Sequence, residues 1–242
     1  MITLNKINKS FQHKQVLFDV SANFQKGKCN FVIGARGSGK SVMMKSMVGL
    51  VQIDSGTIEY EGNDFAHTDY EQKQKIRREI GMLFQGTALF DSLSVEENIA
   101  FPLKMFTQKS ESEILDRVNF CLKRVDLINV NKLYPSSLSG GMKKRVGIAR
   151  AIALNPKYLF CDEPNSGLDP LTSRLIDHLI QEITYEFNIT TVINTHDIKS
   201  LFEMGDNIIF IYKGRNWWEG EKSAIRDSGN AELLNFMKAS EF

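Results

Sequence analysis

The chain has 242 residues, of which 42% are hydrophobic, and its 30 basic residues nearly balance 29 acidic ones. This length suits one large α/β domain or a domain with a sizeable insertion. A net charge of +1 argues against a nucleic-acid-binding surface, and three widely spaced cysteines form neither a disulfide framework nor a metal-ligand pattern, as expected in a reducing cytosol. We expect no secretory signal in residues 1–15, and no apolar stretch approaches the roughly 20 residues of a membrane-spanning helix.

The first part of the chain alternates between strand and helix patterns. Helices are predicted at 42–50 and 72–79, and a polar turn at His13 and Lys14 separates the first two strands. Alternating or continuously apolar runs predict strands at residues 2–7, 16–24, 29–33, 56–62 and 80–85.

From residue 87 helical periodicity takes over, and strands return only after Pro156. The pattern therefore predicts an α/β core interrupted by a helical insertion at about 87–155. The later helices are predicted at 95–105, 111–125, 139–154 and 171–187, and the later strands at 158–161, 190–194 and 207–212. A core-facing side of the last helix is predicted from residues spaced four apart: Leu171, Leu175, Leu179, Ile183 and Phe187.

Residues 34–41 read GARGSGKS, which fits the phosphate-binding loop pattern GxxxxGK followed by Ser or Thr. The motif joins a predicted buried strand to a helix, so backbone N–H groups and the positive helix end point at one spot. We therefore predict a bound nucleotide, with Lys40 at the β and γ phosphates and the Ser41 hydroxyl on Mg²⁺. The nucleotide-contacting residues of this segment are predicted to be Gly34, Ala35, Arg36, Gly37, Ser38, Gly39, Lys40, Ser41 and Val42.

Two further motifs suit phosphate chemistry. Asp162 and Glu163 follow an apolar strand, so Asp162 is placed to hold Mg²⁺ through water and Glu163 to polarise an attacking water. Residues 138–142 read LSGGM and open a helix, where Ser139 is a good N-cap and Gly140 and Gly141 leave backbone N–H groups bare. One nucleotide needs only one such loop, so this second feature is equally compatible with a capped helix that has a flexible start.

Taken together, these motifs resemble those of ABC-type ATPase subunits along the whole chain. The LSGG at 138–141 and the SGLD at 166–169 match the family's signature and D-loop, Gln85 matches its Q-loop and His196 its switch histidine, and Phe11 lies in the aromatic A-loop position. The resemblance implies an α/β P-loop NTPase core with an antiparallel β subdomain and an inserted helical subdomain. The whole chain, 1–242, would be one such domain, with 1–86 and 156–242 as the catalytic core and 87–155 as the helical signature subdomain.

The resemblance also implies a mechanism. Two copies of the chain pack head to tail, and each ATP lies between the phosphate loop of one copy and Ser139, Gly140 and Gly141 of the other. Gln85 would contact Mg²⁺ or the attacking water, His196 would hold the γ-phosphate, and Phe11 would stack on adenine. Such subunits are cytoplasmic and sit on the cytoplasmic face of the inner membrane by binding an integral-membrane permease.

Three residues depart from the usual family pattern: Arg36 in the phosphate loop, Val42 after it, and Met142 after LSGG. None of these changes removes a required charge or donor, so we expect ATPase activity to survive.

One branch of the family resembles this chain in particular. Residues 86–98 read GTALFDSLSVEEN and, with the LSGGM variant, resemble Mla- and Mkl-type lipid-transport ATPases. This implies phospholipid transport across the bacterial envelope and an additional lipid-binding subunit as partner, with no nucleic acid. An amino-acid or other small-solute importer remains the alternative, although importers usually read LSGGQ. A soluble, non-transport ABC ATPase is disfavoured, because that class usually joins two such domains or carries a long coiled coil.

Two apolar features are left over. Trp217 and Trp218 are adjacent on a predicted strand, so they should face opposite ways and leave at least one exposed. A groove for a permease helix is predicted from Leu89, Phe90, Leu93, Phe101, Pro102, Leu103 and Phe106.

Overall fold

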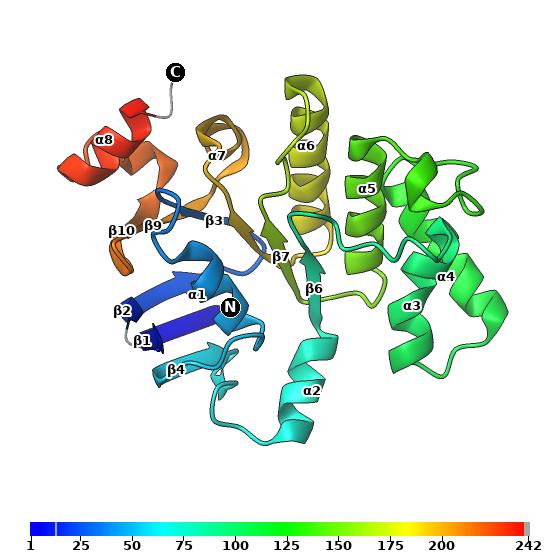
Figure 1. Cartoon of the computed structure of the whole chain (residues 1–242), viewed down its shortest axis with the longest axis horizontal. Helices are drawn as coiled ribbons and strands as arrows, with labels where there is room; N and C mark the ends of the chain where they lie inside the picture. Colours follow the sequence, from blue (N-terminus) through cyan, green and yellow to red (C-terminus); the bar gives the residue numbers. More distant parts are fainter. Residues whose placement is uncertain (13, 240–242) are drawn as a thin grey trace.

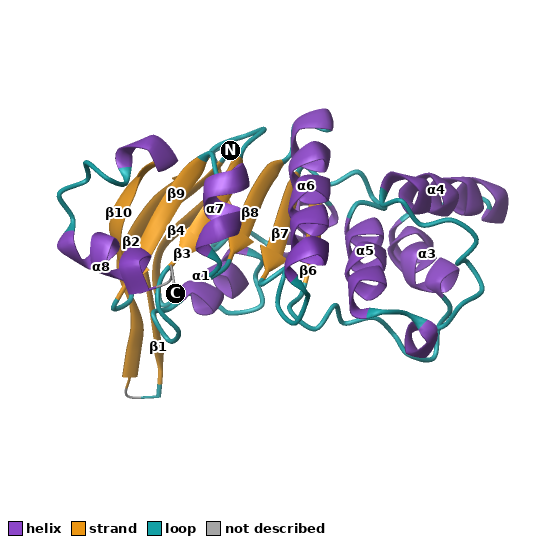
Figure 2. Cartoon of the chain, turned by 90° about the horizontal axis from the view of Figure 1, so that it is seen from above, coloured by secondary structure: helices purple, strands orange, loops and turns teal. Residues whose placement is uncertain are grey.

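The structure, a computed structural model, describes residues 1–12 and 14–239 and contains two sheets and a separate group of helices (Figures 1 and 2). The smaller sheet is antiparallel, with the strand order β2-β1-β4-β5. Its strands are β1 (Ile2–Phe11), β2 (Lys14–Phe24), β4 (Ser55–Tyr60) and β5 (Asn63–Asp64). Of the predicted turn residues, His13 lies outside the described residues and Lys14 is already the first residue of β2.

The larger sheet has the order β10-β9-β3-β8-β7-β6, and all of its neighbours run parallel except β10 against β9. Every residue of β3 and β8 is buried, including the polar residues Asn30, Thr190, Thr191 and Asn194, as expected for central strands of a parallel sheet that is covered on both faces. Because the strands are parallel, the segments that follow β3, β6, β7 and β8 emerge at the same edge. The strands are β3 (Cys29–Ile33), β6 (Ile80–Leu83), β7 (Tyr158–Asp162), β8 (Thr190–Asn194), β9 (Asn207–Tyr212) and β10 (Arg215–Glu221).

A helical group lies beyond α6 in both views (Figures 1 and 2). The side chains of Ser94 and Ser110 form capping boxes at the starts of α3 and α4, each with a glutamate three residues later. These caps fix the first residues of both helices, Val95 and Glu111, which are also the starts predicted from the sequence. The group consists of α3 (Val95–Phe106), α4 (Glu111–Arg124), the 3-10 turn η1 (Pro135–Ser137) and α5 (Gly140–Ala151).

The long helix α6 (Pro170–Glu186) buries a different side from the one predicted. Its buried apolar residues are Ile176, Leu179, Ile180 and Ile183, whereas Leu171 and Leu175 are 71% and 47% exposed and Phe187, at the C-cap, is also exposed. A row at strict four-residue spacing drifts around a helix of 3.6 residues per turn, so its two ends cannot share one buried face with its middle. The prediction is therefore right for Leu179 and Ile183 and wrong for the other three.

The last part of the chain adds helices that the sequence pattern does not predict, α7 (Ile198–Met204) and α8 (Ala231–Ala239), with the 3-10 turn η2 (Lys222–Ala224) between them. On β10 the two tryptophans do face opposite ways. Trp218 packs against the main core, while Trp217 is 42% exposed and donates its Nε1–H to Glu232 of α8 at 3.3 Å.

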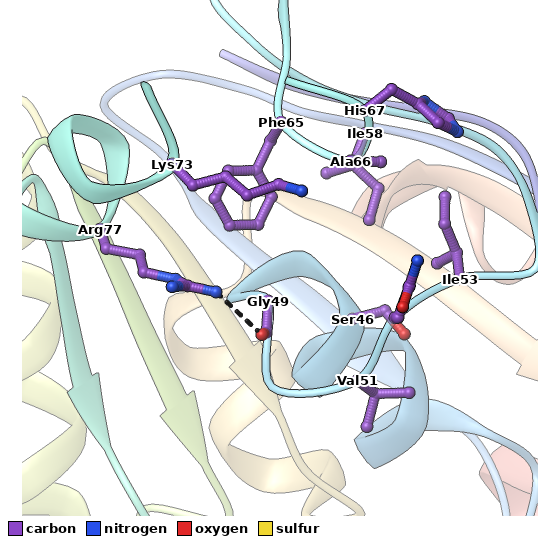
Figure 3. A pocket seen from close by; sticks show the side chains of 11 residues that line it. Ser46, Gly49, Val51, Ile53, Ile58, Phe65, Ala66, His67, Lys73 and Arg77 are labelled. Atoms are coloured by element: carbon purple, nitrogen blue, oxygen red, sulfur yellow. Dashed lines mark hydrogen bonds between the residues drawn. The ribbon is translucent and has the colours of Figure 1, made fainter. Parts of the chain in front are cut away.

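The phosphate-loop helix α1 (Lys40–Met47) ends near α2 (Tyr70–Arg78), as Figure 3 shows. The Arg77 guanidinium of α2 donates to the Gly49 carbonyl just past the end of α1, at 3.2 Å. The ring of Phe65 lies buried between them, with the Arg77 guanidinium 5.9 Å from its centre. The contact joins α2, which leads into β6, to the helix that starts at the phosphate loop.

Candidate functional site

The loop between β3 and α1 has the backbone that a phosphate cradle requires. Gly34, Gly37 and Gly39 have φ angles of +145°, +78° and +109°, which L side chains rarely adopt. A Cβ on Gly34 would lie 2.2 Å from the Ile211 carbonyl oxygen, and one on Gly39 would lie 2.9 Å from Leu17. Gly34 and Gly39 are therefore required for both conformation and space, and Gly37 for conformation alone.

The polar side chains of this loop point to an anion. The Ser38 hydroxyl is buried and has no hydrogen-bond partner among the described residues. Lys40 as a residue is 7% exposed, and its amine donates to the carbonyls of Gly34 and Ala35 at 2.7 and 3.1 Å. Burial lowers the pKa of Lys40, and the carboxylates of Glu163 and Asp162 oppose that shift. A buried cation and an unpaired hydroxyl at the start of a helix suit the charge of a phosphate group.

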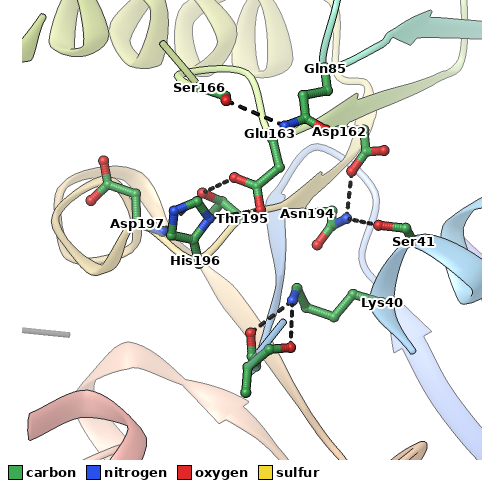
Figure 4. A network of polar contacts seen from close by, with 12 residues as sticks. Lys40, Ser41, Gln85, Asp162, Glu163, Ser166, Asn194, Thr195, His196 and Asp197 are labelled. Carbon is green, nitrogen blue, oxygen red and sulfur yellow. Dashed lines mark hydrogen bonds and ion pairs between the residues drawn. The ribbon is translucent and has the colours of Figure 1, made fainter. Parts of the chain in front are cut away.

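The predicted Mg²⁺ residues from two different elements are joined by Asn194 (Figure 4). The amide of Asn194, the last residue of β8, donates to the Ser41 hydroxyl at 3.2 Å and to the Asp162 carboxylate at 2.5 Å. Burial raises the pKa of Asp162, and the bond from Asn194 partly offsets this. Ser41 and Asp162 thus converge on one point as oxygen donors, the ligand type that Mg²⁺ prefers.

Next to this point, Glu163 and His196 form a pair. The Nδ1 atom of His196 lies 2.9 Å from a carboxylate oxygen of Glu163, and the Thr195 hydroxyl lies 3.5 Å from the other (Figure 4). Glu163 has a φ of +49°, an uncommon conformation held by the bond from its N–H to the Asn194 carbonyl at 2.8 Å. Backbone strain of this kind gathers at functional sites.

Gln85 lies at the same edge of the sheet but bonds elsewhere. Its side-chain amide donates to the Ser166 hydroxyl of the predicted D-loop at 3.4 Å, rather than to Ser41 or Asp162. Its backbone carbonyl accepts a 2.6 Å bond from the buried amine of Lys144, which also donates to the Glu163 carbonyl at 3.3 Å. Lys144 of α5 therefore ties the Q-loop to the glutamate.

Three further residues at the site, Lys144, Asn194 and Arg150, are not among those predicted from the sequence. Arg150 donates to the carbonyls of Thr87 and Ala88, both at 2.7 Å, and so holds the segment after Gln85. A signal existed for Asn194, since it is a polar residue that directly follows the apolar pair Val192 and Ile193 at the end of a predicted strand. Lys144 and Arg150 look like ordinary basic residues of a helix, and only the fold shows that their donors are buried.

The start of α5 is distant from the phosphate loop of the same chain. Both views place α5 on the far side of α6 from α1 (Figures 1 and 2). The Ser139 side chain caps α5 by accepting from the Met142 N–H at 3.2 Å. A Cβ on Gly141 would lie 2.6 Å from Thr172 of α6, and one on Gly140 would lie 3.4 Å from Leu168 of the D-loop. One chain therefore brings together the phosphate loop and the Asp162–His196 cluster, but not the LSGG segment.

Phe11 and the three unusual residues, all in the described part of the chain, form no hydrogen bond, ion pair or ring contact with the Asp162–His196 cluster. Phe11, at the end of β1, is 45% exposed, and the Lys9 amine lies 5.3 Å above its ring. Arg36 is exposed on the loop. Val42 and Met142 are partly buried and pack against the two hydrophobic cores, so each has a packing role.

Comparisons with known proteins identify the family. A sequence model described as ABC transporter matches residues 17–166, which is more than half of the chain. The chain belongs to the ABC transporter family. It is an ABC ATPase, with the cassette fold and the antiparallel and helical subdomains that its motifs imply.

Curated ABC relatives match along nearly the whole chain. Over 236 residues the chain is 36% identical to the "Probable ribonucleotide transport ATP-binding protein mkl" of Mycobacterium tuberculosis, covering 98% of this chain and 66% of that protein. It is 35% identical over 258 residues to the "Methionine import ATP-binding protein MetN" of Campylobacter jejuni, covering 100% of this chain and 77% of that protein. The chain thus spans about two thirds of the length of the mkl relatives.

Solved ABC cassettes have the same fold. A dimeric structure of MJ0796, a bacterial ABC transporter cassette, superposes with a TM-score of 0.84 at 31% identity, covering 91% of this chain and 98% of that one. The cbiO1 protein of Clostridium perfringens, part of the ABC transporter complex cbiONQ, gives a TM-score of 0.84 at 28% identity, covering 100% and 98%. ABC cassettes of this fold thus form dimers and occur in transporter complexes.

Proposed function

We propose that this chain binds and hydrolyses ATP as the motor subunit of a membrane transporter. The observation that carries the proposal is the cluster at the carboxyl edge of the parallel sheet. Lys40 and Ser41 at the start of α1 face Asp162, Glu163 and His196 from the ends of β7 and β8 (Figure 4). A phosphate cradle, an oxygen-donor pair and a carboxylate–histidine pair in one place are the parts that phosphoryl transfer to water requires.

The residues present fit ATP with Mg²⁺. The unpartnered Ser38 hydroxyl and the glycine cradle suit the phosphates, while Ser41 and Asp162 would hold the ion. When bound, Mg²⁺ neutralises charge that develops on the phosphates. Glu163 would accept a proton from the attacking water, His196 would hold Glu163 and the γ-phosphate in place, and Gln85 would orient the water.

The site is completed by a second copy of the chain. Ser139, Gly140 and Gly141 present a helix N-terminus with no phosphate loop of their own chain in front of it. A head-to-tail dimer would place that N-terminus over the nucleotide of the partner, which explains why one chain carries two phosphate-binding features. The dimeric MJ0796 cassettes, one of them in a post-hydrolysis state bound to ADP and Pi, support this arrangement.

The permease would dock in a groove beside the Q-loop. A cleft of about 400 Å³ lies between β6 and the helical group. Phe90, Phe101, Pro102 and Phe106 line it as predicted, and the rings of Phe90 and Phe101 contact each other at a tilt of 50° with their centres 4.9 Å apart. The other three predicted residues, Leu89, Leu93 and Leu103, do not line it. Leu103 is 1% exposed within the core, and Leu89 is packed against that core. Along the described residues no helix has the length and apolarity to cross a membrane, so the proposal assigns that role to the permease.

The first test separates nucleotide binding from hydrolysis. Lys40→Ala should weaken ATP binding, because it removes the buried cation beside the phosphates. Glu163→Gln should retain binding but raise the barrier to hydrolysis by about 2–4 kcal/mol. Binding and turnover of the purified chain are measured together, with Glu71→Gln on the exposed start of α2 as the control. Undiminished turnover in the Glu163→Gln protein would remove the catalytic assignment.

The second test addresses the shared site. Lys40→Ala and Ser139→Arg damage opposite faces, so mixing the two proteins should restore up to one intact site per dimer. If the ATPase activity of the mixture never exceeds that of either variant alone, then the head-to-tail geometry is wrong or one intact site cannot hydrolyse ATP by itself. A crosslink between Ser139 and Ser38 of different copies distinguishes these outcomes.

The cargo is best assigned to the small-solute class. The relatives named above carry ribonucleotide transport and methionine import in their names, and this supports the importer alternative over phospholipid. The lipid hypothesis rests on residues 86–98 and Met142, which resemble the lipid-transport branch. Deleting the gene decides between them: lost uptake of a nutrient with a normal envelope supports the importer, and disturbed outer-membrane phospholipids with detergent sensitivity support lipid transport.

A further inference from the structure

A second pocket, away from the nucleotide cluster, lies between the end of α1, strand β4 and helix α2 (Figure 3). Its volume is about 240 Å³, which is the volume of about eight water molecules. Phe65 and Ile58 supply an apolar wall, and Ser46, Lys73 and Arg77 supply polar groups. A drug-sized ligand needs a larger pocket, so this one fits a ligand of about ten heavy atoms.

The Ser46 hydroxyl is the most informative polar group. Ser46 is 2% exposed, lines the pocket, and its Oγ has no hydrogen-bond partner among the described residues. A buried hydroxyl left unpaired is unfavourable, so its persistence calls for an explanation. Less than 1 Å² of this oxygen is accessible as the pocket stands, so a bound acceptor would supply the missing partner once the Ser46 side chain rotates toward the pocket.

The charge around the pocket is positive. Lys73 and Arg77 are four residues apart on α2, so they project from the same side of the helix. Figure 3 shows the Lys73 side chain reaching across the Phe65 ring and the Arg77 side chain reaching toward Gly49. One N–H group of Arg77 donates to the Gly49 carbonyl. The Lys73 amine forms no hydrogen bond or ion pair with the described residues. At the rim, the Asp64 carboxylate is already paired with His67 at 2.8 Å and accepts from the Ala66 N–H.

We propose that this pocket binds a small amphiphilic anion, a carboxylate or phosphate monoester on a short apolar body. The anionic head would accept from Lys73, the remaining Arg77 donors and Ser46, and the body would pack against Phe65 and Ile58. Charge-assisted bonds from two cations to one anion are among the stronger polar contacts in proteins.

The position of the pocket would couple binding of such a ligand to binding of ATP. Ser46 lies in the last turn of α1, the helix that begins at Lys40, and α2 leads directly into β6 and then Gln85. A ligand held by Ser46 and by Lys73 would bridge these two elements, so its binding free energy would be coupled to that of ATP in both directions. The pocket itself does not involve Lys40 or Glu163, so its existence is independent of the proposed ATPase mechanism.

The test titrates the full chain with octanoate and with hexyl phosphate. Octan-1-ol serves as the probe that lacks the anionic head, and inorganic phosphate as the probe that lacks the apolar body. Binding is followed by chemical-shift changes of the backbone amides. One anion should bind saturably at one site around Ser46 and Lys73, at least tenfold tighter than octan-1-ol and than inorganic phosphate. The tighter of the two anions identifies the head group.

Variants locate the site. Lys73→Met should weaken binding at least tenfold, and it removes no hydrogen bond of the folded chain, so loss of fold does not confuse the result. Lys75→Met, two residues along α2, should leave the affinity unchanged, as should Lys40→Ala, which disables the phosphate loop instead. Equal affinity for octanoate and octan-1-ol, unchanged affinity in Lys73→Met, or no saturable binding of either anion would each overturn the proposal.

Discussion

The buried carboxyl of Asp177 makes the stability of the fold depend on pH in a way that one substitution should remove. Asp177 of α6 is 3% exposed and accepts from the Ser200 hydroxyl at 2.6 Å and from the Asn165 amide at 2.8 Å. Ser200 belongs to α7, just past His196, and Asn165 lies just before the D-loop. The three side chains therefore join α6 to α7 and to the segment just before the D-loop, two parts of the chain that follow residues of the nucleotide cluster.

Burial raises the pKa of Asp177 to about 6, and the nearby carboxylates of Asp197 and Glu203 add to this shift, while the bonds from Ser200 and Asn165 oppose it. Arg174 and Lys199 line the same pocket, and Arg174 pairs with Glu203 at 3.4 Å. A folded-state pKa above the ordinary value of 3.8 means that the folded chain holds this proton more tightly than the unfolded chain. Stability is therefore greatest when the carboxyl is protonated and falls as pH rises from about 4 to about 6.

The difference between the folded and unfolded pKa values of Asp177 lowers the free energy of unfolding by about 3 kcal/mol when the pH rises across both values. About 1–2 kcal/mol of this loss occurs between pH 5 and pH 8. Asp177→Asn keeps the shape and cannot ionise, and Asn165 has a free buried amide oxygen that can accept from the new amide after a flip. Comparing this variant with the parent protein cancels the titration of every other group. The stability of the variant relative to the parent should therefore improve by about 1–2 kcal/mol from pH 5 to pH 8.

The assay is urea unfolding of the full chain at pH 5, 6, 7 and 8, with unfolding free energies from linear extrapolation. Asp227→Asn, an exposed residue, is the control and should shift stability by the same small amount at every pH. If the difference between Asp177→Asn and the parent is the same at all four pH values, then Asp177 is ionised throughout, and the reasoning from burial fails.

Three further predictions test other contacts. Lys144→Met removes the donor to the Gln85 and Glu163 carbonyls, so turnover should fall about 10-fold to 100-fold with a smaller change in KM for ATP, and equal losses of ATP binding and turnover would contradict this. Gly39→Ala should abolish ATP binding and lower unfolding stability by about 1–3 kcal/mol, because it adds a clash with Leu17 to the strain of a positive φ. Gly62→Ala, with a positive φ but open space, measures the strain alone. Phe90→Asp should release the subunit from its permease without loss of ATP binding, whereas Phe120→Asp on α4 should not, as judged by co-purification from membranes.

Much of the fold follows from the sequence because its signals are local. Several features depend only on residues that are neighbours in the sequence, so their patterns can be read from the sequence. These features are the phosphate loop, the capping boxes before α3 and α4, and the buried strands β3 and β8. The same holds for the order of the family motifs along the chain, which by itself indicates the ABC cassette. Helices α7 and α8 are short and carry weak periodicity, so only packing against the sheet reveals them.

Tertiary structure alone decided which side chains meet. The bonds from Asn194 to Ser41 and Asp162, and from Lys144 to Gln85 and Glu163, join residues that are far apart in sequence. No local pattern encodes such contacts, because they depend on which strands are neighbours in the sheet and on where α5 packs. The buried side of α6 was likewise set by its neighbours, which cover Ile176 and Ile180 but leave Leu171 and Leu175 exposed. The sequence by itself thus determined the family and the nucleotide-binding chemistry, while the three-dimensional packing determined how the catalytic groups are held.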